Sequence, residues 1–317
     1  MIRAVQQIML GSVSGTEERA RETLRRVREA GYDGIELNGF MIRPTPLLVR
    51  LLTKAAGMPA GRGGRLDWPA LIRESGLRVV GIHEDLGGLE QEPEERIAAA
   101  ASLGTDRIII TGMYRFDYGD AAGVRALAGR LNAVGERLKR DGVRLYYHNH
   151  NCELLKTGQG SAARGPLQAG PGRAAREQLN AESCRADCER LNAEPGRTAF
   201  ELLLEETDPD LVAFEFDSYW FTEGGADARA WMRRMGPRMK LWHINDRGTR
   251  STGPAMTPIL KSDSMELGTG NMDLEGLAAI AMENGIEAVV LESHRNWIDK
   301  DPVRSLELSG QWLNAHF

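Results

Sequence analysis

The sequence predicts a (β/α)8 TIM barrel formed by a single domain over residues 1–317. Two observations carry this prediction. Short apolar runs alternate with longer amphipathic stretches eight times, which is the pattern of strands that are each followed by a helix. Ionisable residues also follow several of the apolar runs directly, and the carboxyl ends of the strands form the active site of such a barrel. A doubly wound open sheet is the alternative, but no Gly-x-Gly-x-x-Gly turn opens the first helix.

The first half of the chain supplies five of the eight strands. Its first helix ends at Gly31, because glycine readily adopts the left-handed conformation that follows many helices. The fourth strand has the β-branched sequence Arg-Ile-Ile-Ile-Thr. We predict strands at residues 5–10, 34–37, 77–83, 107–111 and 143–147, and helices at 16–30, 46–56, 68–75, 94–103 and 121–140.

The alternation is interrupted after the fifth strand. Residues 156–196 are rich in Gly, Pro, Ala and Arg, so we predict a flexible insertion, because such a segment has little apolar surface to offset the entropy of ordering. Residues 174–192 within it can form a solvated helix rich in Arg and Glu. The alternation resumes with predicted strands at 211–216, 239–244 and 288–291, and predicted helices at 199–206, 226–235, 274–284 and 302–313.

Composition narrows the class of protein. Forty basic and 45 acidic residues give a net charge of −5, which disfavours nucleic acid as a partner. No apolar run approaches the roughly 18 residues of a membrane span, and the N-terminal residues lack the apolar region of a signal peptide. We therefore expect a cytoplasmic protein without membrane contact. Three cysteines argue against a disulfide framework, and Cys184 and Cys188 lack the further ligands of a zinc site.

A cluster of potential ligands follows the fifth strand. The stretch Tyr146 to Glu153 reads Tyr-Tyr-His-Asn-His-Asn-Cys-Glu, and the alternation of a strand allows both His148 and His150 to point inward. Three later apolar runs also end in a ligand type, namely Asp217, His243 and Glu292. Carboxylates and imidazoles at successive strand ends predict a site for a divalent cation such as Mn²⁺, Mg²⁺, Co²⁺ or Zn²⁺.

Seven short motifs occur in register along nearly the whole chain. They are Gly-Tyr-Asp-Gly-Ile-Glu-Leu at 31–37, Gly-Ile-His at 81–83, Tyr-His-Asn-His-Asn-Cys-Glu at 147–153, Glu-Phe-Asp-Ser-Tyr-Trp at 215–220, Trp-His-Ile-Asn-Asp at 242–246, Glu-Leu-Gly-Thr-Gly at 266–270 and Leu-Glu-Ser at 291–293. Together they resemble the xylose isomerase-like TIM-barrel superfamily, and specifically its sugar phosphate isomerase/epimerase branch. Residues 156–196 have no counterpart in that pattern.

The resemblance implies a particular ligand set for the metal. Three ligands carry over directly, namely Asp217, His243 and Glu292, and Glu153 is the implied fourth. Many relatives have a glutamate within strand five itself, where this chain has His148, and the carboxylate of Glu153 comes five residues later. Glu153 would then reach back from the loop, or His148 or His150 would replace it.

The resemblance also implies roles around the metal. A metal that bridges the carbonyl and hydroxyl oxygens of a sugar acidifies the neighbouring proton and stabilises the enediolate that forms. Glu292 and Glu153 are the implied catalytic bases. The expected substrate-binding residues are Glu36, His83, His148, His150, Trp220 and Arg295.

The implied activity is that of a metal-dependent isomerase or epimerase acting on a sugar or sugar phosphate. A dehydratase resembling inosose dehydratase is the alternative, because the same enediolate can expel a β-hydroxyl group. An abasic-site endonuclease fits less well, since it would need more histidines than the six present and a basic groove. A non-catalytic sugar-binding barrel would not need the ligand set. The expected partner is a small sugar or polyol, and a homo-oligomer is left open.

Overall fold

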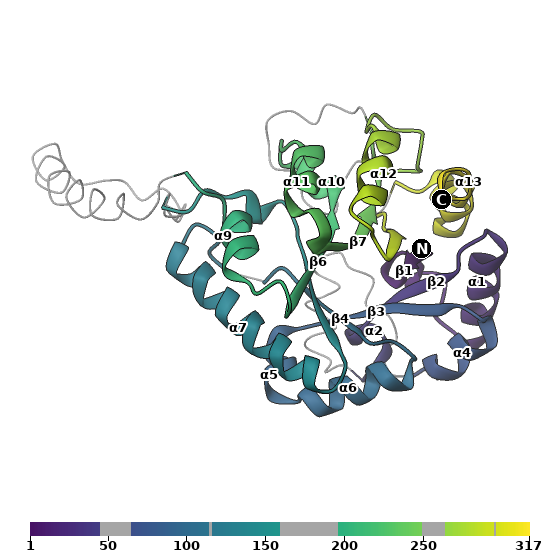
Figure 1. Cartoon of the computed structure of the whole chain (residues 1–317). Coiled ribbons are helices and arrows are strands. Elements are labelled where there is room, and N and C mark those ends of the chain that lie inside the picture. The colour runs from purple at the N-terminus through teal and green to yellow at the C-terminus, as the bar shows by residue number, and fades with distance from the viewer. Residues whose placement is uncertain (45–64, 114–115, 159–195, 249–263, 295) are drawn as a thin grey trace, which may run out of the picture.

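A barrel surrounded by helices makes up the computed structural model, which describes residues 1–44, 65–113, 116–158, 196–248, 264–294 and 296–317 (Figure 1). Eight parallel strands close the barrel, and each pairs with its neighbours in chain order. They are β1 (Ile2–Gln6), β2 (Gly34–Asn38), β3 (Arg78–Glu84), β4 (Arg107–Thr111), β5 (Arg144–His148), β6 (Val212–Asp217), β7 (Met239–Ile244) and β10 (Ala288–Leu291). The predicted (β/α)8 TIM barrel is therefore confirmed.

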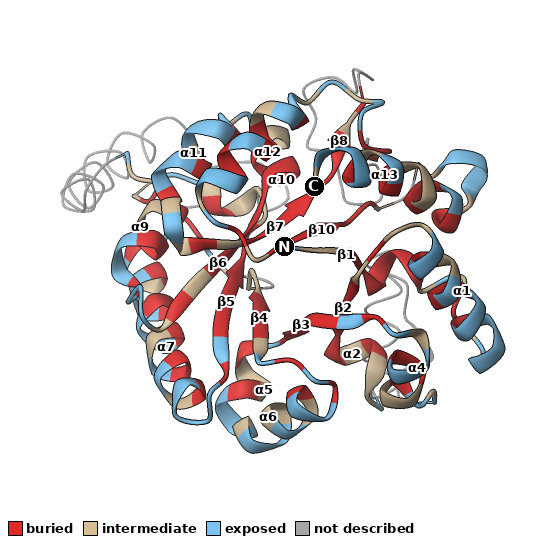
Figure 2. Cartoon of the chain, turned by 45° about the vertical axis from the view of Figure 1, so that its right-hand side comes forward, coloured by how far each residue is buried: buried red, intermediate tan, exposed pale blue. Residues whose placement is uncertain are grey.

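Helices surround the strands and bury the face that they turn toward the barrel (Figure 2). The α-helices are α1 (Glu17–Glu29), α2 (Gly39–Ile42), α4 (Trp68–Ser75), α5 (Leu86–Gln91), α6 (Pro93–Ser102), α7 (Ala121–Arg140), α9 (Ala199–Glu206), α10 (Ser218–Glu223), α11 (Ala228–Met235), α12 (Leu274–Glu283) and α13 (Pro302–His316). Outside the barrel, β8 (Asp246–Arg247) pairs antiparallel with β9 (Ser264–Met265). Within the described ranges, no helix combines the length and the apolar character needed to cross a membrane.

Side-chain caps fix where several helices begin. Thr198 and Glu201 form a capping box at α9, in which each side chain bonds the backbone N–H of the other residue. Asp120 caps α7 by accepting a hydrogen bond from the N–H of Ala122. Because these caps satisfy N–H groups that have no partner within the helix, they define the loop-to-helix boundaries after the strands.

The alternation of side chains along each strand separates two layers of the core. On β6, Phe214 and Phe216 pack outward against the helices, so Glu215 and Asp217 point into the barrel. Inside the barrel, one apolar layer fills the lower part and comprises Ala4, Val80, Ile109, Tyr146, Leu241, Ala288 and Val290. The next inward positions along β5, β7 and after β10 are His148, His243 and Glu292, so the ionisable residues occupy the carboxyl end of the barrel.

The structure corrects the first predicted strand. The predicted range 5–10 is wrong, because β1 is Ile2–Gln6 and residues 7–10 form the 3₁₀ helix η1 (Gln7–Leu10). The Gln6 side chain accepts a hydrogen bond of 2.6 Å from the N–H of Ile8, which turns the chain at this point. The predicted helix 46–56 lies outside the described residues. So do residues 159–195 of the predicted insertion, which include Cys184 and Cys188.

Candidate metal centre

Seven buried ionisable side chains meet at the carboxyl end of the barrel. They form two groups in which the candidate ligand atoms all lie within 4.8 Å of one another. One group, called here the outer group, is His148, Asp217, His243 and Glu292. The other, called here the inner group, is Glu36, His83, Glu215 and His243. His243 belongs to both groups, because its two ring nitrogens face different carboxylates.

The outer group contains three of the four ligands that the resemblance implies. His243 Nδ1 lies 3.0 Å from Glu292 Oε2 and 3.9 Å from Asp217 Oδ2. Two imidazoles and two carboxylates at such spacing suit Zn²⁺, Mn²⁺ or Co²⁺. Asp217 also accepts a hydrogen bond of 2.9 Å from the N–H of Trp220 at the start of α10 through Oδ1, so its Oδ2 remains directed at the group.

The inner group lies on the other side of the His243 ring. Glu36 Oε2 lies 2.7 Å from His243 Nε2 and 2.8 Å from His83 Nε2. Glu215 Oε2 lies 3.3 Å and 3.2 Å from the same two nitrogens. The ring of His243 is therefore held between carboxylates on both of its nitrogens.

Burial and charge act strongly on these groups. Burial and the nearby Glu292 carboxylate, opposed by His243, together raise the pKa of Asp217 to about 8. Burial lowers the pKa of His83, but Glu36 and Glu215 outweigh that effect and raise it to about 10. Carboxylates crowded in this way are stabilised by a nearby cation, whether that cation is a metal or an imidazolium.

Several buried polar atoms of the cluster have no hydrogen-bond partner among the described residues. They are both carboxylate oxygens of Glu215, Oε1 of Glu36 and Nδ1 of His148. Buried polar atoms are normally hydrogen-bonded, and an ion is one of the groups that can satisfy them. The residues present therefore fit a cation at this end of the barrel.

The structure does not bring Glu153 to either group. Its buried carboxylate accepts hydrogen bonds of 2.8 Å from the hydroxyl of Tyr147 and 3.0 Å from the N–H of His150. Tyr147 points outward from β5, opposite to His148, so Glu153 lies behind the strand rather than inside the barrel. Of the alternatives for the fourth ligand, the geometry favours His148.

The aromatic rings of His150, Trp220 and His294 lie in a row beside the outer group. The ring of His150 lies 5.2 Å from that of His148 and 5.6 Å from that of Trp220, measured between centroids. Trp220 in turn lies 5.9 Å from His294. His150 and Trp220, both predicted to contact substrate, therefore border the cluster. Arg295 lies outside the described residues.

Two functional candidates were missed by the sequence reasoning. Glu215 lies two residues before Asp217 and so shares its inward face, a period-two signal that was available in the sequence. Asn149 fixes the end of β6, because its side chain donates to the carbonyl of Asp217 at 3.1 Å and accepts from the N–H of Asp217 at 2.9 Å. No sequence pattern identifies these two hydrogen bonds of Asn149 in advance.

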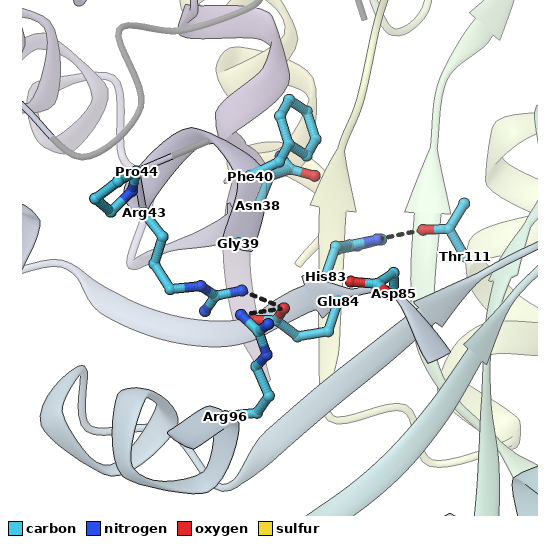
Figure 3. Close-up of a pocket in the computed structure, with 10 residues that line it drawn as sticks. All are labelled: Asn38, Gly39, Phe40, Arg43, Pro44, His83, Glu84, Asp85, Arg96 and Thr111. Atoms are coloured by element: carbon cyan, nitrogen blue, oxygen red, sulfur yellow. Dashed lines mark hydrogen bonds and ion pairs between the residues drawn. The ribbon is translucent and has the colours of Figure 1, made fainter. Parts of the chain in front are cut away.

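A cavity of about 370 Å³ opens beside the cluster at the ends of β2, β3 and β4 (Figure 3). His83 links the two, because its Nδ1 lies 2.8 Å from Thr111 Oγ1 on the cavity side and its Nε2 faces Glu36. Glu84 forms ion pairs with Arg43 and, at 3.8 Å, with Arg96. The lining residues are Asn38, Gly39, Phe40, Arg43, Pro44, His83, Glu84, Asp85, Arg96 and Thr111.

Solved structures with the same barrel are similar to this chain over nearly its full length. A sugar phosphate isomerase/epimerase from Parabacteroides distasonis is 20% identical, with a TM-score of 0.67 over 99% of this chain and 94% of the other. The zinc-bound IolI protein is 12% identical, with a TM-score of 0.62 over 100% and 99%. The probable 3-DHS dehydratase AsbF from Bacillus anthracis is 12% identical, with a TM-score of 0.61 over 99% of each chain.

No family model matches the sequence, and no match is found among curated proteins. At these levels of identity the solved structures establish a shared fold. They include sugar phosphate isomerase/epimerase and xylose isomerase-like barrels, in agreement with the resemblance drawn from the motifs.

Proposed function

We propose that this chain is a divalent-metal-dependent enzyme that removes a proton next to the carbonyl of a sugar and returns one, so that the sugar is isomerised or epimerised. The observation that carries the proposal is the outer group, which gathers two imidazoles and two carboxylates at the catalytic end of a TIM barrel. A cavity opens beside the cluster at His83 of the inner group, so part of a substrate can lie next to these residues.

The four residues of the outer group would hold the cation. Each comes from the end of a different strand, so the barrel itself sets their positions: β5 for His148, β6 for Asp217, β7 for His243 and β10 for Glu292. A divalent cation bound there would polarise a substrate carbonyl and stabilise the negative charge that develops on its oxygen. The zinc reported for the IolI protein supports this choice of cofactor class.

Glu292 is the residue that we assign as the base. Glu292 is 8% exposed, whereas Glu36 and Glu215 are 0% exposed, so Glu292 is the better placed of these three residues to meet a substrate. Its Oε2 also lies 3.7 Å from His294 Nε2, which places a second proton carrier beside it. A carboxylate next to a polarised carbonyl needs no unusual pKa to move the α-proton.

The cavity would bind the remainder of the sugar. Its volume falls within the range of about 300–1,000 Å³ that is common for small-molecule sites. Asn38, Thr111 and His83 offer side-chain donors and acceptors for hydroxyl groups, and paired Arg and Glu side chains continue that surface outward. This lining suits an uncharged polyol portion of a substrate.

Exchange of substrate protons with solvent tests the proposal. Manganese-loaded enzyme in D₂O should place deuterium on the carbon next to the carbonyl of at least one ketose from a panel, as seen by NMR. Glu292→Gln should slow this exchange by about 10²–10⁴-fold, the usual contribution of a positioned base. Glu266→Gln, which alters another buried carboxylate outside both groups, should retain it.

Two results would contradict the proposal. If no sugar in the panel exchanges, proton abstraction from a ketose is not the reaction. If Glu292→Gln exchanges at the wild-type rate with its metal in place, the base lies elsewhere.

A dehydratase is the second candidate. The similarity to the structure of AsbF supports it, because that protein is described as a dehydratase and shares the barrel over 99% of each chain. The same proton abstraction would then be followed by loss of a β-hydroxyl group. Formation of a conjugated product that absorbs in the ultraviolet from an inosose or related substrate would favour this reaction over isomerisation.

A further inference from the structure

We propose that the barrel end holds a second divalent cation, bound by the inner group of Glu36, His83, Glu215 and His243. The four side chains come from β2, β3, β6 and β7, and all four are buried. The site is distinct from the outer group, although the two share His243. The inference does not depend on the reaction that we assign to the chain.

The spacing of the inner group suits a cation. Ligand atoms about 2.0–2.2 Å from a tetrahedral zinc lie roughly 3.4 Å apart from one another. Glu215 Oε2 is already 3.2 Å from His83 Nε2 and 3.3 Å from His243 Nε2. Glu36 Oε2 approaches the same nitrogens at 2.8 and 2.7 Å, which are hydrogen-bond distances, so a small outward shift of one carboxylate would complete the site.

Glu215 supplies an independent indication of a ligand. Its side chain is 0% exposed, and neither of its carboxylate oxygens has a hydrogen-bond partner among the described residues. A buried carboxylate is costly to desolvate, so it is normally hydrogen-bonded, ion-paired or bound to a metal. The three nearest nitrogens belong to His83, His148 and His243, and all lie at 3.2 to 3.3 Å from Oε2.

The charge of the whole cluster points the same way. The two groups together contain four carboxylates, Glu36, Glu215, Asp217 and Glu292, all of which lie inside the barrel with three histidines. The four carboxylates contribute four negative charges when they are ionised. One divalent cation balances half of that charge, so the carboxylates provide enough negative charge for a second.

His243 would connect the two cations. Its Nδ1 faces Asp217 and Glu292, and its Nε2 faces Glu36 and Glu215. Coordination through both nitrogens requires the ring to lose its remaining proton to solvent, so binding of the second cation releases one proton from His243.

Metal stoichiometry tests the proposal directly. The full-length protein, stripped with chelator and dialysed against Mn²⁺, should contain two equivalents by elemental analysis. Electron paramagnetic resonance of the loaded protein should show the multiline signal of two coupled ions in place of the six-line signal of an isolated Mn²⁺. Glu215→Gln removes one inner ligand with little change in shape, so it should reduce the content to one equivalent and restore the six-line signal.

Matched variants separate this effect from a loss of fold. Glu266→Gln changes a buried carboxylate that bonds Ser305 and lies outside both groups, so it should keep two equivalents. If Glu215→Gln fails to fold by circular dichroism, Glu36→Gln provides the same test. One equivalent in the saturated wild type, or two equivalents in a folded Glu215→Gln, would overturn the second site. Neither result would affect the proposed reaction, which is tested by exchange at the outer group.

Discussion

At the scale of single residues, Asp217 has two roles that can be separated. Its Oδ1 caps α10 by accepting from the N–H of Trp220, while its Oδ2 faces the outer group. Asp217→Asn should keep the cap, since Asn caps helices as well as Asp does, but should lose the cation. Asp217→Ala should lose both, and the metal-free protein should be about 1 kcal/mol less stable than Asp217→Asn.

Elemental analysis and urea unfolding in chelator measure the two effects. Equal stability of the two variants would show that the cap contributes nothing measurable. Stoichiometric metal in both variants would remove Asp217 from the ligand set.

Glu153 provides a second test at this scale. Its carboxylate bonds Tyr147 and the backbone of His150 behind β5, so its role in the structure is to anchor the turn after the strand. Glu153→Gln replaces one of these two acceptors by an amide donor, so one of the hydrogen bonds from Tyr147 and His150 is lost or reversed, which should cost about 1–3 kcal/mol of unfolding free energy. The cation content should remain at the wild-type value. A folded Glu153→Gln that binds no metal would restore Glu153 as a ligand.

The sequence predicted the site in part. Asp217, His243 and Glu292 were found because each follows an apolar run at a strand end, and the structure brings them together. Glu215 was missed because it lies inside such an apolar run, where a single charged residue can be tolerated without any function. The place of Glu153 could not be foreseen, because it depends on the outward direction of Tyr147 and on a turn that carries no periodic signal.

At the scale of elements, the segment that follows the two-stranded sheet of β8 and β9 depends on Asp246. Its carboxylate accepts from the backbone N–H groups of Gly268 at 3.1 Å, Gly270 at 2.8 Å and Met272 at 3.0 Å. These hydrogen bonds fasten the segment that leads into α12. A Cβ atom on Gly270 would collide with the Asp246 carboxylate and with the carbonyl of Arg247.

We therefore expect Gly270→Ala to release this segment. Amide hydrogen exchange of residues 264–272 should accelerate, because charge-assisted hydrogen bonds worth about 1.5–3 kcal/mol each are strained or lost. Gly142→Ala in the turn before β5 is a useful comparison, since it has a positive φ of 73° but open space around it. It should destabilise the barrel without a selective effect on residues 264–272. Unchanged exchange in Gly270→Ala would contradict the anchoring role.

Long elements were predictable and short ones were not. The predicted helix 121–140 and strand 107–111 match α7 and β4, because both have a sustained period and clear caps or β-branched content. The helices α2, α5 and α10 contain four to six residues, too few to show a helical period. They begin at the ends of β2, β3 and β6, next to the site, where the backbone follows tertiary contacts.

At the scale of the whole molecule, the cation should stabilise the fold increasingly as the pH rises. In the metal-free protein the raised pKa values of Asp217, about 8, and His83, about 10, favour the protonated forms in the native state. The stability from these protons is fully present below the unfolded pKa values. It is lost as the pH rises through the folded values. The stability that metal binding contributes has the opposite pH dependence and increases as the pH rises, since the cation requires deprotonated ligands.

The difference in Tm between metal-loaded and chelator-treated protein should therefore grow from pH 5 to pH 8. At one hundred times the dissociation constant, a bound cation adds about 2.7 kcal/mol to the free energy of unfolding. Differential scanning fluorimetry across this pH range measures the trend. A difference that is constant or shrinks as the pH rises would contradict a cation bound by these carboxylates and imidazoles.

Anomalous diffraction from crystals grown with Mn²⁺ tests the central claim, that the outer group is a metal centre, most directly. The account predicts an anomalous peak within coordination distance of Asp217, His243 and Glu292, with His148 as the fourth protein ligand and Glu153 still bonded to Tyr147. A barrel end without a peak, or a peak whose ligands include Glu153 and exclude His148, would contradict it.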